Sequence, residues 1–154
     1  MSNVVTRLAF AAALAVLAPV AAQAAVTLNC ATGATRVVIA PGDYPRFALP
    51  ANAGFATIPG MATAIKQGAK SCVIVYFSMG VVSSSAVQVR AVLDNVAGDP
   101  SAIHVFNSGG VPAAEMTSFI FKSVALGTHK IDIQYSSTGT VEFGDLHMIV
   151  NYAP

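Results

Sequence analysis

Tryptophan is absent from this chain of 154 residues, and charged residues make up only 10% of it. Eight Lys and Arg face seven Asp and Glu, and apart from Arg7 the basic residues are scattered between Arg36 and Lys130. They form no stripe that could displace the counterions of a nucleic acid. The low charge argues against DNA or RNA as a partner, and a hydrophobic content of 55% argues for one globular domain.

A membrane-spanning segment is also missing. The N-terminal apolar run, Leu8–Val20, has 13 residues, whereas a transmembrane helix needs about 17 to 25. The run follows Arg7 and leads into Ala22-Gln23-Ala24, which has the small-x-small form of a secretory cleavage site. We therefore expect residues 1–24 to be a cleaved signal peptide. Residues 25–154 are expected to form one exported domain without a membrane span, in the periplasm, at the cell surface or secreted.

Cysteine occurs only twice, as Cys30 and Cys72. Neither lies in a C-x-x-C pair and no histidine is near either in sequence, which disfavours a metal site built from thiolates. Thiols of exported proteins are oxidised, so we expect the two to form a disulfide. The bridge would close a loop of about 42 residues, for which chain entropy gives at most about 4 kcal/mol of stabilisation.

Helical periodicity is nearly absent after residue 25, and alternation of Val, Ile, Thr, Phe and Tyr with other residues takes its place. Pro-Gly, Gly-Gly and Gly-Asp-Pro sequences interrupt the alternation as turns. The chain is therefore predicted to be all-β, a single antiparallel β-sandwich of jelly-roll-like form. The candidate strands are residues 26–30, 36–40, 56–58, 62–65, 72–78, 86–93, 103–106, 118–124, 129–136, 140–143 and 146–152.

Two tight turns are predicted near the C-terminus. Every second residue of Lys130–Ser136 is apolar, and Ser137–Gly139 has the composition of a three-residue hairpin loop, which would pair Tyr135 with Val141. The register of this hairpin agrees with the apolar faces of its two strands.

The second turn is predicted at Gly144-Asp145, and it would place Glu142 opposite His147 on an exposed face. Such a polar cluster is most simply a surface contact. It could instead be half of a catalytic or metal-binding constellation.

The aromatic residues divide into a core set and an exposed one. Cys72–Phe77 is continuously apolar, which indicates a central strand covered on both faces and places Tyr76 in the core. Tyr135 is expected in the core as well. Tyr44 lies beside Arg46 in a loop rich in Pro and Gly, where its ring could stack on a sugar.

The order of segments between residues 72 and 152 resembles other proteins. The segments concerned are Val75–Met79, Val87–Asp94, Ser118–Phe121, Leu126–Gln134 and Gly139–Phe143. In this order they resemble a loosely defined class of exported bacterial and phage-associated β-sandwich modules. The resemblance implies a jelly-roll-like fold and a role in surface binding rather than catalysis, and it supplies no catalytic motif.

A second resemblance rests on the cysteine spacing and on the ending Met148–Pro154, which look like a chaperone-assembled pilin. Such subunits carry a donor strand ahead of the first cysteine. Here only Ala25–Asn29 would precede Cys30, which is too short to fill a strand-accepting groove. A pilin-like fimbrial subunit is kept as an alternative.

Motifs for common chemistries are missing. The sequence has no G-x-S-x-G, no H-E-x-x-H and no phosphate-binding glycine loop. His129 is interpreted as a strand-end residue that hydrogen-bonds a turn carbonyl. A small secreted hydrolase acting on glycans or esters would need at least two of five side chains to meet in one pocket. These are Asp132, Asp145, Glu142, His129 and His147.

The sequence thus favours an exported, non-catalytic surface-binding or structural module without a cofactor, whose ligand is a glycan or a protein. Loops would carry the recognition. The candidate contact residues are Tyr44 and Arg46 in one loop and Asn107 and Ser108 in another. Low charge leaves strand edges poorly guarded, which favours a homo-oligomer.

Overall fold

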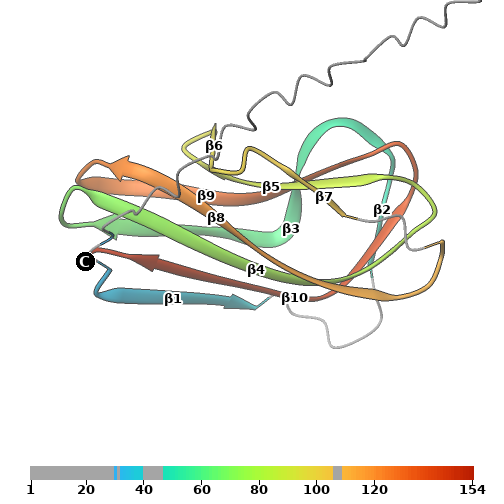
Figure 1. Cartoon of the computed structure of the whole chain (residues 1–154), viewed down its shortest axis with the longest axis horizontal. Helices are drawn as coiled ribbons and strands as arrows, with labels where there is room; N and C mark the ends of the chain where they lie inside the picture. The colour runs from blue at the N-terminus through green and yellow to red at the C-terminus, as the bar shows by residue number, and fades with distance from the viewer. Residues whose placement is uncertain (1–29, 31, 40–46, 106–108) are drawn as a thin grey trace, which may run out of the picture.

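The computed structural model describes residue 30 and residues 32–39, 47–105 and 109–154, which fold into two stacked five-stranded antiparallel sheets (Figure 1). Sheet A has the order β1-β10-β4-β8, with β2 also paired to β10, and sheet B has the order β3-β9-β5-β6, with β7 also paired to β5. The strands of sheet A are β1 (Ala34–Ile39), β2 (Phe47–Leu49), β4 (Ser71–Ser83), β8 (Ala113–Val124) and β10 (Val141–Tyr152). Those of sheet B are β3 (Asn52–Gln67), β5 (Val87–Leu93), β6 (Val96–Ala97), β7 (Ile103–Val105) and β9 (Gly127–Ser137).

The long strands change sheet at nearly every step along the chain. β3, β5 and β9 belong to sheet B, whereas β4, β8 and β10 belong to sheet A. This alternation, together with the pairing of β1 with the last strand, is the double Greek key of a jelly roll. The predicted all-β, antiparallel, jelly-roll-like fold is confirmed. No helix that could span a membrane occurs in the described part of the chain.

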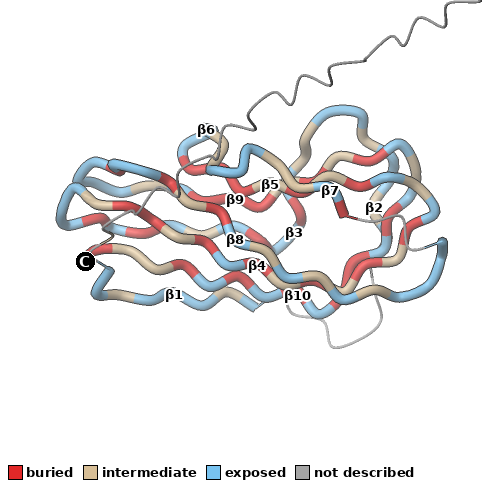
Figure 2. Tube along the Cα trace, viewed as in Figure 1, coloured by how far each residue is buried: buried red, intermediate tan, exposed pale blue. Residues whose placement is uncertain are grey.

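The core lies between the two sheets, and buried residues alternate with more exposed ones along much of the long strands (Figure 2). Phe77, Phe119 and Phe143 of sheet A are completely buried, and Ile131 and Ile133 of sheet B are buried against them. Burying one such side chain stabilises the fold by about 1.5 to 3 kcal/mol. The alternation seen in the sequence therefore serves to build a single core between two layers.

The predicted hairpin at Ser137–Gly139 is wrong, because β9 belongs to sheet B and β10 to sheet A. Tyr135 and Val141 both face the core as expected, and they do so from opposite sheets. The Tyr135 ring meets the Phe143 ring edge-on across the core, with centroids 5.8 Å apart and planes at 75°. Two apolar strand faces look alike in sequence whether the strands pair side by side or face each other across a core.

Two predicted strand breaks are continuous strands with bulges. β3 runs through Pro59-Gly60 with a shifted register, and β10 runs through Gly144-Asp145, where Asp145 has a φ of 50°. The predicted pairing of Glu142 with His147 is therefore wrong. On sheet A they pair instead with Val82 and Ser78 of β4. A bulge absorbs one extra residue without reversing the chain, and its Gly and Asp resemble those of a turn.

β4 is central in sheet A, as its apolar sequence predicts, but it is covered on one face only. Val73, Val75 and Phe77 are buried, whereas Tyr76 is 39% exposed. The placement of Tyr76 in the core was wrong, because a two-layer sandwich leaves the outer face of each sheet uncovered.

The disulfide between Cys30 and Cys72 is confirmed, with the two Cα atoms 5.2 Å apart. Cys72 is 5% exposed and begins β4, so the bridge fastens the segment ahead of β1 to a central strand of the same sheet. The loop that it closes spans 42 residues. This length makes the bridge a strong constraint on the unfolded chain.

Candidate functional site

Asp94 and Asn95 form the two-residue turn between β5 and β6. Leu93 pairs with Val96 across the turn, and Asp94 and Asn95 have φ angles of 50° and 68°. Two positive φ angles are typical of the type I′ hairpin turn, whose twist matches that of the strands and which Asp and Asn tolerate well. The turn projects the Asp94 side chain toward the start of β9.

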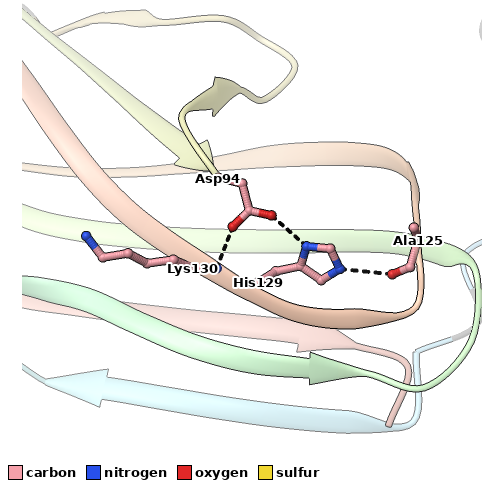
Figure 3. A network of polar contacts seen from close by, with 4 residues as sticks. All are labelled: Asp94, Ala125, His129 and Lys130. Atoms are coloured by element: carbon pink, nitrogen blue, oxygen red, sulfur yellow. Dashed lines mark hydrogen bonds and ion pairs between the residues drawn. The ribbon is translucent and has the colours of Figure 1, made fainter.

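Asp94 and His129 form a network that ties three segments together (Figure 3). Asp94 Oδ1 accepts a 2.8 Å hydrogen bond from the backbone N–H of Lys130, and Asp94 Oδ2 lies 2.7 Å from His129 Nδ1. His129 Nε2 lies 2.9 Å from the carbonyl oxygen of Ala125. We call these groups the Asp94–His129 clamp, since they join the β5–β6 turn, the start of β9 and the β8–β9 connection.

The contacts of His129 favour its protonated form. Both ring nitrogens face acceptors, a carboxylate oxygen and a carbonyl oxygen, and only the imidazolium form has an N–H at both positions. The hydrogen bond to Asp94 accordingly raises the pKa of His129. The Lys130 backbone N–H and then His129 lower the pKa of Asp94. The interpretation of His129 as a strand-end residue bonded to a turn carbonyl is confirmed. The sequence did not predict its second contact, which is with Asp94.

The clamp gives the fold a defined pH dependence. The contribution of His129, whose folded pKa is raised, is complete below the ordinary histidine pKa of about 6.5 and is lost as pH rises through the folded value. The contribution of Asp94, whose folded pKa is lowered, is complete above about 3.9 and is lost as pH falls through the folded value. The clamp therefore stabilises most between those two ordinary values.

We expect His129→Gln to lower the free energy of unfolding at mildly acidic pH by up to about 1 kcal/mol, since the half-exposed Asp94 carboxylate is screened by water. The variant should lose less stability than the wild type between neutral and alkaline pH. Asp94→Asn should lower the free energy of unfolding in the same way. The double variant should be little less stable than either single variant, because both substitutions remove the same contact. Urea unfolding across pH measures this, and parallel pH curves for wild type and His129→Gln would contradict the clamp.

An open pocket of about 430 Å³ lies beside the clamp, between the β5–β6 hairpin and the end of β8. Its walls are mainly apolar, and its polar groups are Asp94, His129, Asp99 and Lys122. The lining residues are Leu93, Asp94, Val96, Ala97, Gly98, Asp99, Ile120, Phe121, Lys122, Val124, Ala125 and His129. We call this cavity the corner pocket.

The segment after β6 closes one side of the corner pocket. Asp99 and Ile120 exchange two backbone hydrogen bonds of 2.9 Å, and the Asp99 carboxylate meets Lys122 Nζ at 2.6 Å. A Cβ at Gly98 would lie 3.1 Å from Phe121 Cζ, so glycine permits this close approach. These contacts join the two sheets at one edge, and the corner pocket lies next to them.

The charged groups of the corner pocket already have partners within the fold. Both carboxylate oxygens of Asp94 and both ring nitrogens of His129 are engaged, and Asp99 pairs with Lys122. An imidazolium that donates both protons cannot accept one as a general base. In the described ranges no group of three or more His, Cys, Asp or Glu is placed to hold a metal ion. The arrangement suits binding of a ligand more than proton transfer.

Four of the other predicted site residues, Tyr44, Arg46, Asn107 and Ser108, fall outside the described residues. Glu142 and His147 are on the exposed face of β10, in the other sheet from His129.

Of the five hydrolase candidates, Asp145 and His147 share a hollow. It has a volume of about 310 Å³, lies on the outer face of sheet A and also includes Glu115. No hydrogen bond or ion pair with another described residue orients either Asp145 or His147. Asp132 is 5% exposed on β9, where its Oδ1 lies 3.0 Å from Lys130 Nζ. The structure therefore brings two candidates together without arranging them as an acid–base pair.

Comparisons with known proteins support the fold. No protein-family model and no curated protein sequence matches the chain. A chain of the T13 particle of infectious bursal disease virus matches over 80% of this chain and 32% of its own, at 15% identity and a TM-score of 0.50. This chain thus spans about a third of the length of that viral chain. The viral chain is an independent example of the same sandwich fold.

Two carbohydrate-binding modules match with lower scores. The module CBM6cm-2 of Cellvibrio mixtus lichenase 5A, solved with cellotriose, covers 80% of this chain and 91% of its own at 11% identity and a TM-score of 0.42. The module CBM36, solved with calcium and xylotriose, covers 75% and 94% at 16% identity and a TM-score of 0.38.

Proposed function

We propose that this protein is an exported, non-catalytic binding module whose ligand occupies the corner pocket. The observation that carries the proposal is a cavity of about 430 Å³ with mainly apolar walls, in which Asp94, His129, Asp99 and Lys122 are paired with one another. Volumes of about 300 to 1,000 Å³ are typical of small-molecule sites. Export through the signal peptide of residues 1–24 is part of the proposal, and the disulfide agrees with it.

The chemistry of the pocket favours a neutral ligand with an apolar body. Two anionic and two cationic groups balance around the rim when His129 is protonated. Leu93, Val96 and Phe121 supply apolar wall. A charged ligand would have to break one of these ion pairs and leave one member unpaired. The free energy lost in this way exceeds the free energy gained from the new contact. An aliphatic or aromatic group in the pocket displaces water without that cost.

Titration with the neutral fluorescent probe N-phenyl-1-naphthylamine tests the proposal. The wild type should bind one probe per chain with a saturable rise in fluorescence. Ala97→Phe fills the pocket and should weaken binding at least tenfold. Ala64→Phe makes the same change on the exposed face of β3 and should leave binding unchanged. Absence of saturable binding, or equal binding by the Ala97→Phe variant, would refute the pocket as the ligand site.

A glycan ligand at the loops of residues 41–46 and 107–112 is the alternative binding mode. Tyr44, Arg46, Asn107 and Ser108 would contact it, with the Tyr44 ring stacking on a sugar. A glycan screen with Tyr44→Ala separates the two modes, because loss of glycan binding in this variant would favour the loops over the pocket.

A hydrolase remains the alternative function because Asp145 and His147 line one hollow. An ester and glycoside substrate screen tests it. Turnover by the wild type that disappears in His147→Ala would overturn the non-catalytic proposal, whereas absence of turnover with retained probe binding supports it.

A further inference from the structure

Three rows of residues that run across the outer face of sheet A are mostly apolar and contain no Lys, Arg, Asp or Glu. Directly paired residues of neighbouring strands share a face, so the register identifies the rows. The first row is Ile39, His147, Ser78 and Met116, the second is Val37, Ile149, Tyr76 and Ser118, and the third is Thr35, Asn151, Ile74 and Ile120. We call these twelve residues the sheet A patch.

Large apolar side chains of the sheet A patch are widely exposed. Met116 is 79% exposed and Ile39 62%, and Val37, Tyr76 and Ile149 are exposed as well. His147 is the one titratable side chain among the twelve apart from the tyrosine. A soluble sandwich normally places polar residues on the outer faces of its sheets. The patch departs from this rule.

Sheet B shows the usual pattern on its outer face. Arg90 Nε donates a 2.9 Å hydrogen bond to Gln134 Oε1, and Lys130 Nζ lies 3.0 Å from Asp132 Oδ1. Ser136 continues the polar row by donating to the carbonyl of Asn52. The outer face of sheet B thus carries charged side chains along its length, whereas the three rows of the sheet A patch contain no Lys, Arg, Asp or Glu. The difference indicates that the outer face of sheet A is covered in the working protein.

We propose that the sheet A patch is the interface of a homodimer in which two copies stack sheet A on sheet A. Strands β1, β10, β4 and β8 have 6, 12, 13 and 12 residues. At about 3.3 Å per residue and 4.8 Å between strands they make a face of roughly 680 Å². A stable interface buries about 600 to 1,000 Å² on each partner, so the dimer uses the whole outer face of sheet A, with the sheet A patch at its centre. Stacked β-sheets in proteins generally lie about 10 Å apart, with their strands at a small angle.

The shape and charge of this face favour an identical partner. Met116 is 79% exposed and forms one wall of the hollow of about 310 Å³, which Met79, Gly80 and Ala114 also line and which Glu115 and Asp145 border. A two-fold interface uses the same patch on both partners, so a knob and a hollow on one face can both be filled. A strongly charged partner would find no oppositely charged side chain in the three rows. This interface differs from pairing of strand edges, which the low charge of the sequence also favours.

Sedimentation equilibrium of the purified protein, over a hundredfold range of concentration, tests the proposal. The wild type should be a dimer. Met116→Lys and Val37→Lys place a charge on opposite sides of the patch and should each weaken dimerisation at least a hundredfold. Leu126 is 66% exposed on the β8–β9 connection, so Leu126→Lys is the matched control and should leave the dimer intact.

Each other outcome contradicts the stacked dimer. A wild type that stays monomeric throughout the range would show that a second copy does not cover the patch. Dimers that persist in both Met116→Lys and Val37→Lys would place the contact at the strand edges. Because both residues are more than half exposed, the lysine variants should remain folded, with the circular dichroism spectrum of the wild type. Tyr76→Ser is a further variant that weakens stacking without adding charge.

Discussion

Removing the disulfide is expected to lower the free energy of unfolding by up to about 4 kcal/mol. Cys30→Ser opens a loop of 42 residues. The unfolded chain then gains the conformational entropy that the crosslink denies it, and unfolding becomes more favourable. Cys30 is only partly buried, so the substitution creates little cavity. Chemical denaturation of the two forms measures the difference.

Reduction of the wild type provides the control for this prediction. Reduced wild type and Cys30→Ser should have the same stability, and reductant should not change the variant. A loss below about 1 kcal/mol would mean that the unfolded chain is already compact around this loop, and the bridge would then contribute little.

Truncation of the core on β4 is expected to have an effect of similar size. Phe77 is completely buried between the sheets, and Phe77→Ala should cost about 3 to 5 kcal/mol through lost burial and the remaining cavity. Tyr76→Ala is the matched control, because Tyr76 is the preceding residue and points outward. It should cost well under half as much. Urea unfolding of the two variants in dilute solution measures both values.

Equal losses in the Phe77 and Tyr76 variants would contradict a two-layer sandwich, since they would place both faces of β4 inside a core. The measurement is made in dilute solution because Tyr76 belongs to the proposed dimer interface. At higher concentration, weaker dimerisation of Tyr76→Ala would lower its apparent free energy of unfolding as well.

The strands and their inward faces could be predicted from the sequence because period-two alternation reports burial directly. Ile131, Ile133 and Tyr135 are buried as their spacing indicates. Sheet membership could not be predicted in this way. Strands β9 and β10 present apolar faces that fit a hairpin equally well, and only the long-range pairing of β9 with β3 and β5 decides between the two arrangements.

The bulges escaped prediction for a related reason. Gly144-Asp145 has turn-forming residues, and whether the chain reverses there depends on β4, which lies more than 60 residues earlier and pairs with β10 on both sides of the bulge. Local sequence carries no information about that partner.

The candidate site was predictable only in part. His129 could be placed at a strand end, and Asp94-Asn95 followed by Val-Ala is a signal for a two-residue hairpin turn that sequence reasoning missed. The meeting of Asp94 with His129 joins residues 35 positions apart. The corner pocket also depends on the backbone pair between Asp99 and Ile120, for which the sequence offers no pattern.

We propose that the ionisable groups of the corner pocket stabilise the fold and do not perform catalysis. Long-range ¹H–¹⁵N correlation spectra of the imidazole rings test this proposal, because they report whether each ring nitrogen carries a proton. At about pH 6.5, where an ordinary histidine is half protonated, His129 should be mainly imidazolium with protons on both Nδ1 and Nε2. A neutral His129 ring with an unprotonated nitrogen at that pH would contradict the account and return His129 to the set of candidate general bases.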